Sequence, residues 1–191
     1  MKEQPLDPTS ILEREFGYAM QTALQSSEDR ARIFGYHLTV TGTLLAAAIA
    51  MATDTNIANQ PEVAWVLALL FAILTLFGML SMLQLAKLRM AWRDSVLTMN
   101  RIKEYYIRFN QNIKLEKAFR WRTETIPAAN KPWTVAFMLA LSVIVTSSVT
   151  TAAAILAASF ALSGQFAITA GAAGGVIAFV VQLVLWFAVL R

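Results

Sequence analysis

Residues 63–86, VAWVLALLFAILTLFGMLSMLQLA, form a continuous apolar stretch without a single charged side chain. As an α-helix this stretch would be about 36 Å long, enough to cross the roughly 30 Å hydrocarbon core of a bilayer. Three further stretches, residues 33–53, 133–160 and 166–190, also lack Asp, Glu, Lys and Arg. A β-barrel would show alternating rather than continuous apolar residues. The sequence therefore predicts four transmembrane helices.

The overall composition supports this prediction. Hydrophobic residues make up 57% of the 191-residue chain and charged residues only 15%, whereas a soluble domain carries about 25% charged residues. Disorder is excluded as well, because it requires low hydrophobicity and high net charge. The chain has no cysteine, which excludes disulfides and thiolate chemistry. We expect an all-α integral membrane protein whose four spans form two hairpins.

The distribution of basic residues predicts the orientation. Four of the sixteen Lys and Arg residues precede the first span, eleven lie between residues 87 and 131, and none lies in the two short loops 54–62 and 161–165. Basic loops remain in the cytoplasm. We therefore expect both termini and the central linker to be cytoplasmic, with the protein in the inner or plasma membrane of the cell.

The chain is predicted to have four parts. Residues 1–32 form a cytoplasmic amphipathic helix, introduced by a capping box at Ser10 and Glu13. Residues 33–86 are the first transmembrane hairpin, residues 87–132 are a basic helical linker that continues the second span, and residues 133–191 are the second hairpin.

Apolar residues repeat along the linker at gaps of three and four, the spacing of a coiled-coil seam. Two partners fit this seam: the linker of another subunit, or the N-terminal helix of the same subunit. The sequence leaves both open. The seam residues are Leu88, Trp92, Met99, Ile102, Tyr106, Phe109 and Ile113.

The linker is also strongly basic, with eleven basic and four acidic residues between 87 and 131. An anionic lipid or a soluble protein is the candidate partner, because clustered basic residues attract anionic surfaces. The charges have a topological explanation too, so no nucleic acid is expected. A cytoplasmic vestibule of basic residues would raise the local anion concentration; its members are Arg101, Lys103, Arg108 and Lys114.

The spans lack the groups that chemistry requires. Proton relays use ionisable residues inside the membrane, and hydrolysis requires a nucleophile with a base, or metal ligands. Apart from the single histidine, His37, the four spans contain no ionisable residue of the Asp, Glu, Lys or Arg type. We expect His37 to hydrogen-bond a neighbouring helix or to reach interfacial water, and we predict no catalytic residues, no metal and no cofactor.

Small and hydroxyl residues are abundant instead. A hydroxyl stripe in the third span is the candidate pore lining, with close helix packing as the alternative; it comprises Ser142, Thr146 and Thr150, with Ser147 and Thr151 alongside. Gly42 and Ala46, and Gly171 and Gly175, lie at four-residue spacing and predict helix-packing faces. Gln182 should find an interhelical partner, since hydrocarbon offers none. More packing faces than one subunit needs suggest a homo-oligomer.

The first part of the chain resembles the SLATT-type membrane effector domains of bacterial conflict systems. The shared layout is an N-terminal helix at residues 11–32, two spans at 33–53 and 63–86, and a long helix that follows them. The likeness is one of layout rather than of motif, and the second hairpin departs from it. The resemblance implies an oligomeric membrane pore.

Two functions follow as hypotheses. The first is a non-enzymatic homo-oligomeric pore or channel for ions or small solutes, since four helices in one subunit pack without a lumen. The second is a membrane-anchored adaptor or sensor that recruits a soluble partner through its cytoplasmic helices.

Overall fold

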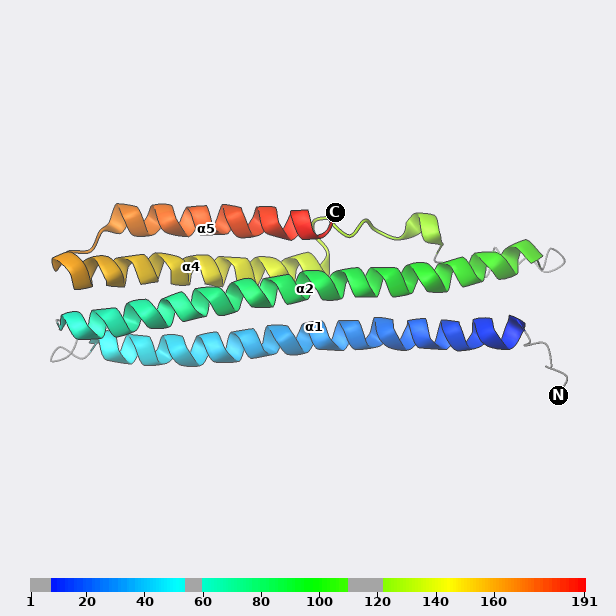
Figure 1. The fold of residues 1–191 in the computed structure, drawn as a ribbon, viewed down its shortest axis with the longest axis horizontal. Coiled ribbons are helices and arrows are strands. Elements are labelled where there is room, and N and C mark those ends of the chain that lie inside the picture. Colours follow the sequence, from blue (N-terminus) through cyan, green and yellow to red (C-terminus); the bar gives the residue numbers. More distant parts are fainter. Residues whose placement is uncertain (1–7, 54–59, 110–121) are drawn as a thin grey trace, which may run out of the picture. The chain divides into compact units, whose positions relative to one another are not determined.

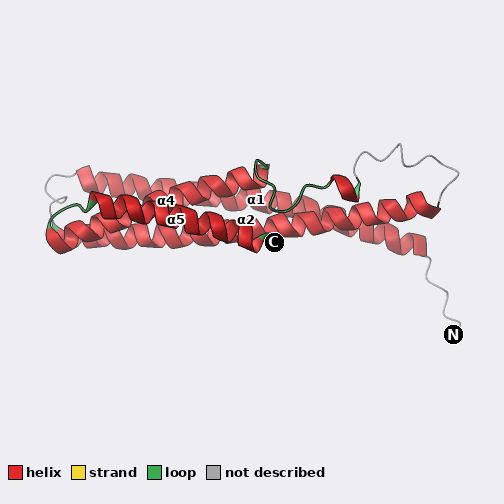
Figure 2. Cartoon of the chain, turned by 90° about the horizontal axis from the view of Figure 1, so that it is seen from above, coloured by secondary structure: helices red, strands yellow, loops and turns green. Residues whose placement is uncertain are grey.

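A computed structural model describes residues 8–53, 60–109 and 122–191. Every regular element in these ranges is helical (Figure 2). The order is α1 (Pro8–Thr53), α2 (Pro61–Phe109), the short 3-10 helix η1 (Thr123–Thr125), α4 (Val135–Ser163) and α5 (Ile168–Val189). Each of the four α-helices is long and apolar enough to cross a membrane. The predictions of an all-helical chain and of four candidate spans are confirmed.

Two helices are much longer than a bilayer requires. With 46 and 49 residues, α1 and α2 extend over about 69 and 74 Å at 1.5 Å per residue, about twice the hydrocarbon thickness. The N-terminal helix therefore continues into the first span without a break, and the second span continues into the linker as far as Phe109. Residues 110–121 of the expected linker helix, including Ile113 and Lys114, lie outside the described residues. In its last part, residues 122–132, the only regular element is the short helix η1, so the linker is not an α-helix there.

The chain divides into two compact units. We call residues 8–30, 88–109 and 122–131 the charged unit, and residues 31–53, 60–87 and 132–191 the apolar unit. Helices α1 and α2 each contribute to both units, whereas α4 and α5 belong wholly to the apolar unit.

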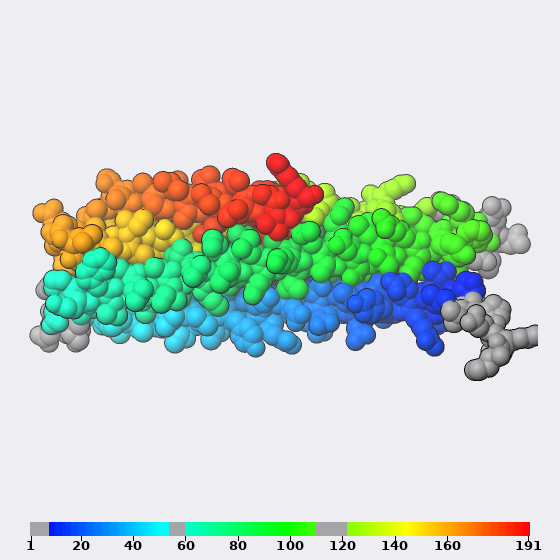
Figure 3. Space-filling model, in the orientation of Figure 1, coloured from blue at the N-terminus to red at the C-terminus, as the bar shows by residue number. Residues whose placement is uncertain are grey.

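In the apolar unit, α4 and α5 run in opposite directions and pack along their lengths (Figures 1 and 3). Helix α4 ends where Gly164 adopts the left-handed region at φ 69° and donates its N–H to the Phe160 carbonyl, a conformation that glycine adopts without strain. The Ser159 hydroxyl then accepts the N–H of Ala167 at 3.0 Å. These contacts make the turn between the helices short.

Both helices of the second pair begin two residues later than expected, and the start of α4 has a clear reason. Trp133 has a φ of 63°, which is incompatible with a helix, and Thr134 is extended with its hydroxyl accepting the N–H of Phe137. Thr134 therefore caps α4, and Trp133 stays outside the helix with 79% of its surface exposed. An amphipathic ring in such a place is typical of the membrane interface.

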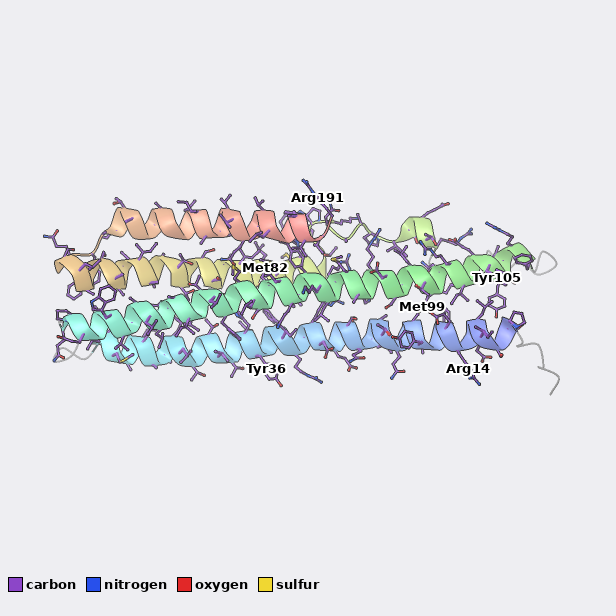
Figure 4. All side chains as sticks on the ribbon, viewed as in Figure 1. Arg14, Tyr36, Met82, Met99, Tyr105 and Arg191 are labelled. Carbon is purple, nitrogen blue, oxygen red and sulfur yellow. The ribbon has the colours of Figure 1, made fainter. Side chains whose placement is uncertain are left out.

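The core of the apolar unit consists of large apolar side chains from α2, α4 and α5, including Phe137 and Ile144 of α4. Leu74, Met82, Leu85 and Trp186 are almost fully buried. Figure 4 shows Met82 on the inner side of α2 and Tyr36 projecting outward from α1, in agreement with their exposures of 0% and 62%.

In the charged unit, the N-terminal part of α1 packs on the C-terminal part of α2. Leu12 and Phe16 of α1 line a groove with Ile102 and Tyr106 of α2. Beside it, η1 is held to α2 because the Glu104 carboxylate accepts the Thr123 N–H at 3.1 Å.

Candidate functional site

The most polar part of the apolar unit is a cluster of hydroxyl, amide and imidazole groups that joins all four helices. His37 of α1 is at its centre and is 1% exposed. Its Nε2 lies 2.8 Å from the Thr146 hydroxyl of α4, which confirms the predicted hydrogen bond to a neighbouring helix. On α2, the Phe77 ring stacks on the imidazole with centroids 5.8 Å apart.

Gly78 allows these helices to approach closely. A Cβ atom added at this position would lie 2.7 Å from the Cβ and 2.9 Å from the Oγ of Ser147, and 3.5 Å from the His37 Cε1. Real side chains do not approach to 2.7 Å, so only glycine fits here. The α2 backbone at Gly78 therefore packs directly on Ser147 of α4, next to the imidazole.

Ser147 is the link between three helices. Its hydroxyl donates to the Thr75 carbonyl of α2 at 3.1 Å and accepts from the Gln182 amide of α5 at 3.0 Å. The predicted interhelical partner of Gln182 is thereby identified. Because hydrocarbon offers no partners, such bonds hold spans together.

The Thr75 hydroxyl extends this network along α4. It lies 3.0 Å from the Thr150 hydroxyl and accepts from Thr151 at 3.3 Å. Of the predicted pore-lining residues, Ser147 and Thr150 are thus buried inside the subunit, Thr146 and Thr151 are half-buried, and Ser142 is exposed. Their role as a pore lining remains a prediction, and no described contact tests it.

The predicted helix-packing residues separate into two groups. At Gly175 an added Cβ would lie 3.1 Å from the Ser148 carbonyl and from Ala152 Cβ, and at Gly171 it would lie 2.7 Å from Leu156 Cγ. These two glycines pack on α4 of the same chain. At Gly42 nothing lies within 4 Å, and the neighbouring Ala46 is exposed.

Sequence reasoning missed Thr75, Gly78 and Thr41. The available signal was the position of Thr75 and Gly78, three residues apart in the most apolar span. A hydroxyl and a glycine are both unusual among large apolar residues. Thr41 lies one helical turn after His37, and at 5% exposure its hydroxyl has no hydrogen-bond partner.

The cluster offers little for catalysis. His37 and Thr146 have the separation of a base and a hydroxyl, but His37 Nδ1 is buried without a partner that would orient the ring. Among the described residues, no group of three or more His, Asp or Glu could hold a metal ion. The arrangement can hold helices together, and its buried atoms without a hydrogen-bond partner among the described residues include Gln182 Oε1.

The predicted basic vestibule lies in the charged unit. Arg101 and Arg108 are exposed, whereas Lys103 is half-buried, with its Nζ 5.9 Å from the centre of the Phe16 ring. Lys103 Nζ also lies 3.5 Å from the Asn100 Oδ1.

The seam residues lie at different depths. Ile102 is buried; Leu88, Trp92, Met99 and Tyr106 are half-buried; and Phe109 is exposed. Contacts of Trp92 with Arg30, and the shared groove of Ile102 and Tyr106 with Phe16, are made within one chain. No matching family model, curated protein or solved structure was found for the chain.

Proposed function

We propose that the chain is a non-enzymatic membrane protein whose copies assemble through the outward face of α1 and conduct ions or small solutes. The observation that supports this is the chemistry of the exposed positions of α1 between residues 35 and 50. Five of them form a strip of small side chains: Gly35, Thr39, Gly42, Ala46 and Ala50, all exposed.

This strip lies opposite the buried side of the helix. At about 100° per residue, these positions fall together, and His37, Thr41 and Ala48, which are buried, lie on the other side. Larger exposed residues flank the strip, Leu38 and Ile49 on one side and Tyr36 and Val40 on the other. A small-residue groove between larger ridges allows a second helix to approach closely.

The exposed positions of α2 and of the later turns of α5 are mostly large and apolar. Helix α2 exposes Trp65, Leu69 and Ile73, and α5 exposes Val180 and Val184. Such side chains suit contact with lipid tails, whereas a strip of glycine, alanine and threonine offers lipid little surface. Because no described part of the chain covers this strip, we assign it to a second copy.

A lumen between subunits would be lined by side chains that each subunit leaves accessible. Thr43 of α1, which lies beside the strip, and Ser142 of α4 are exposed hydroxyls that meet this condition. No span carries Asp, Glu, Lys or Arg, so selectivity would depend on hydroxyls and pore width. The exposed Arg101 and Arg108 would favour anions at the entrance.

The test compares two leucine substitutions in the full chain reconstituted in nanodiscs and in liposomes. Gly42→Leu fills the strip, whereas Ala173→Leu adds bulk at an exposed position of α5 and serves as the matched control. We expect native mass spectrometry to find an oligomer for the wild type and the control, and a smaller particle for Gly42→Leu. Halide flux into liposomes should fall with the oligomer. Wild-type oligomers without flux would refute conduction alone, and a wild-type monomer would refute both parts.

A second candidate function, the adaptor or sensor, is favoured by an aromatic group at the end of α2. Tyr105 and Phe109 are 44% and 66% exposed, with ring centroids 4.5 Å apart. Exposed aromatic residues beside arginines are typical of protein-binding surfaces. Under this hypothesis, Phe109→Ser should remove a co-purifying soluble partner without changing the particle mass, and unchanged co-purification would contradict it.

A further inference from the structure

Three arginines and a tryptophan meet in the charged unit. The guanidinium carbon of Arg89 lies 4.8 Å from the centre of the Trp92 ring, and that of Arg30 lies 5.8 Å from the same centre. Arg30 and Arg93 both act electrostatically on Arg89. Two helices contribute: Arg30 is on α1, and the other three residues are on α2.

Arg89 is unusual because it is 5% exposed while two of its three guanidinium nitrogens have no hydrogen-bond partner among the described residues. Its Nε and Nη2, and the Nε of Arg93, are buried and have no hydrogen-bond partner. Arg30 differs, since it donates from Nε to the Ser26 carbonyl at 3.2 Å and from Nη2 to the Ser27 hydroxyl at 3.0 Å. The unused donors are therefore concentrated on α2.

No carboxylate is among the groups that shift the pKa of Arg89. Glu28 and Asp29 precede Arg30, and Asp94 follows Arg93; Glu28 and Asp94 are exposed. Every resolved influence on Arg89 lowers its pKa: desolvation is the largest, followed by the positive charges of Arg30 and Arg93. An attractive carboxylate would have raised the pKa instead.

Such an arrangement is costly unless an anion completes it. A guanidinium stays charged in proteins, and a buried cation without a partner is strongly unfavourable. The Trp92 ring attracts the guanidinium groups of Arg89 and Arg30, but it offers no acceptor in the ring plane for their N–H donors. A phosphate group has several acceptor oxygens that match the forked donors of arginine.

We propose that Arg89 and Arg93, with Arg30 and Trp92 beside them, form a binding site for a phosphate group. The unpaired Nε and Nη2 of Arg89 and the Nε of Arg93 donate to its oxygens. Arg30 adds charge while remaining bonded to α1. This proposal does not depend on oligomerisation or conduction, because all four residues belong to one chain.

The phosphate has two sources in principle, an anionic lipid headgroup and a soluble phosphorylated molecule. Arg30 lies three residues before the first predicted span and Arg89 three residues after the second. Basic and aromatic residues at such positions lie at headgroup depth. The position in the sequence therefore favours the lipid.

The experiment uses delipidated full-length protein and two probes. Native mass spectrometry measures binding of phosphatidic acid, with phosphatidylcholine as the zwitterionic comparison. Thermal unfolding in detergent measures stabilisation by inorganic phosphate, with chloride at equal ionic strength as its comparison. Binding of phosphatidic acid alone identifies the headgroup, whereas stabilisation by inorganic phosphate identifies a site open to soluble phosphates.

Arg89→Gln and Arg93→Gln remove the donors, and Arg101→Gln removes the same charge from an exposed position on α2. We expect each of the first two to weaken phosphate binding at least about tenfold, since charge-assisted hydrogen bonds are lost, and the third to bind like the wild type. If Arg89→Gln does not fold, the half-buried Arg93 provides the same test. Equal binding by all three variants, or wild-type binding no stronger than to the comparison ligands, would overturn the site.

Discussion

The close contact at Gly78 allows the packing of the polar cluster to be tested with one methyl group. In Gly78→Ala the new Cβ would be placed 2.7 Å from Ser147 Cβ and 2.9 Å from Ser147 Oγ. Ser147 is 1% exposed and bonded to both Thr75 and Gln182. It cannot move away without straining those bonds, so the helices must separate.

The expected magnitude follows from opposing effects. Overpacking a well-packed core costs about 1–3 kcal/mol, and distorting the Ser147 hydrogen bonds adds about 0.5–1.5 kcal/mol. Alanine is favoured over glycine in a helix by about 1 kcal/mol. We expect the free energy of unfolding to fall by about 2 kcal/mol, the middle of a range of about 0.5–3.5 kcal/mol that these contributions span.

Gly17→Ala provides the control, because nothing lies within 4 Å of an added Cβ at this helical position. There only the helix preference remains, so the same substitution should stabilise by about 1 kcal/mol. The assay is reversible unfolding of the full chain in mixed micelles. Ser147→Gly removes the opposing Cβ, so Gly78→Ala should be less harmful in that background by about 1 kcal/mol. If Gly78→Ala stabilises the protein as much as Gly17→Ala does, or if its effect does not change in the Ser147→Gly background, Gly78 does not pack closely on Ser147.

Three further predictions concern separate contacts. Gly175→Ile should lower the free energy of unfolding by about 1–3 kcal/mol, because an added Cβ lies 3.1 Å from the Ser148 carbonyl. Unfolding in micelles measures this loss. An equal loss for Ala173→Ile, at an exposed position, would contradict the prediction. Gln182→Leu should change stability by less than about 1 kcal/mol in the same assay, since the lost bond to Ser147 is offset by removal of the unpaired Oε1; a loss above about 2 kcal/mol would show that the amide oxygen has a partner. Acidification should release η1 from α2. The Thr123 hydroxyl beside the carboxylate is the largest of the influences that lower the pKa of Glu104 below its ordinary value of 4.5. The stability that the charged Glu104 contributes is therefore complete above pH 4.5 and is lost as pH falls through the lowered pKa. Hydrogen exchange of the Thr123 amide, corrected for the intrinsic rate, should lose protection there in the wild type, and protection unchanged down to about pH 3 would refute the prediction.

The helices could be predicted from the sequence because span length and apolar continuity are properties of single segments. The hydrogen bonds of His37 and Gln182 followed from the same reasoning, since a polar group in a span must find a partner on another helix. The helix boundaries were less certain: Trp133 is apolar enough to extend the third span, yet its backbone conformation and the Thr134 cap exclude it from α4.

The rotation of each helix could not be predicted. Hydroxyls occur around much of α4, so the pattern does not indicate that Ser147 and Thr150 are buried while Ser142 is exposed. That distinction depends on Gly78 and Thr75 of α2, which are distant in sequence. Likewise, the glycines of α5 and of α1 have similar spacing, but only the structure shows that Gly171 and Gly175 pack on α4 while Gly42 faces outward. The arginine cluster was missed because Arg30 and Arg89 lie in segments that sequence analysis treated separately.

The central claim is that the small-residue strip of α1 is a contact between copies of this chain. The most direct test is the mass of the wild-type particle released from nanodiscs in native mass spectrometry. We predict an integer multiple of the 21.1 kDa chain, of three or more, that shifts to lower multiples in Gly42→Leu. A particle of one chain, or a multiple that Gly42→Leu leaves unchanged, would contradict the claim.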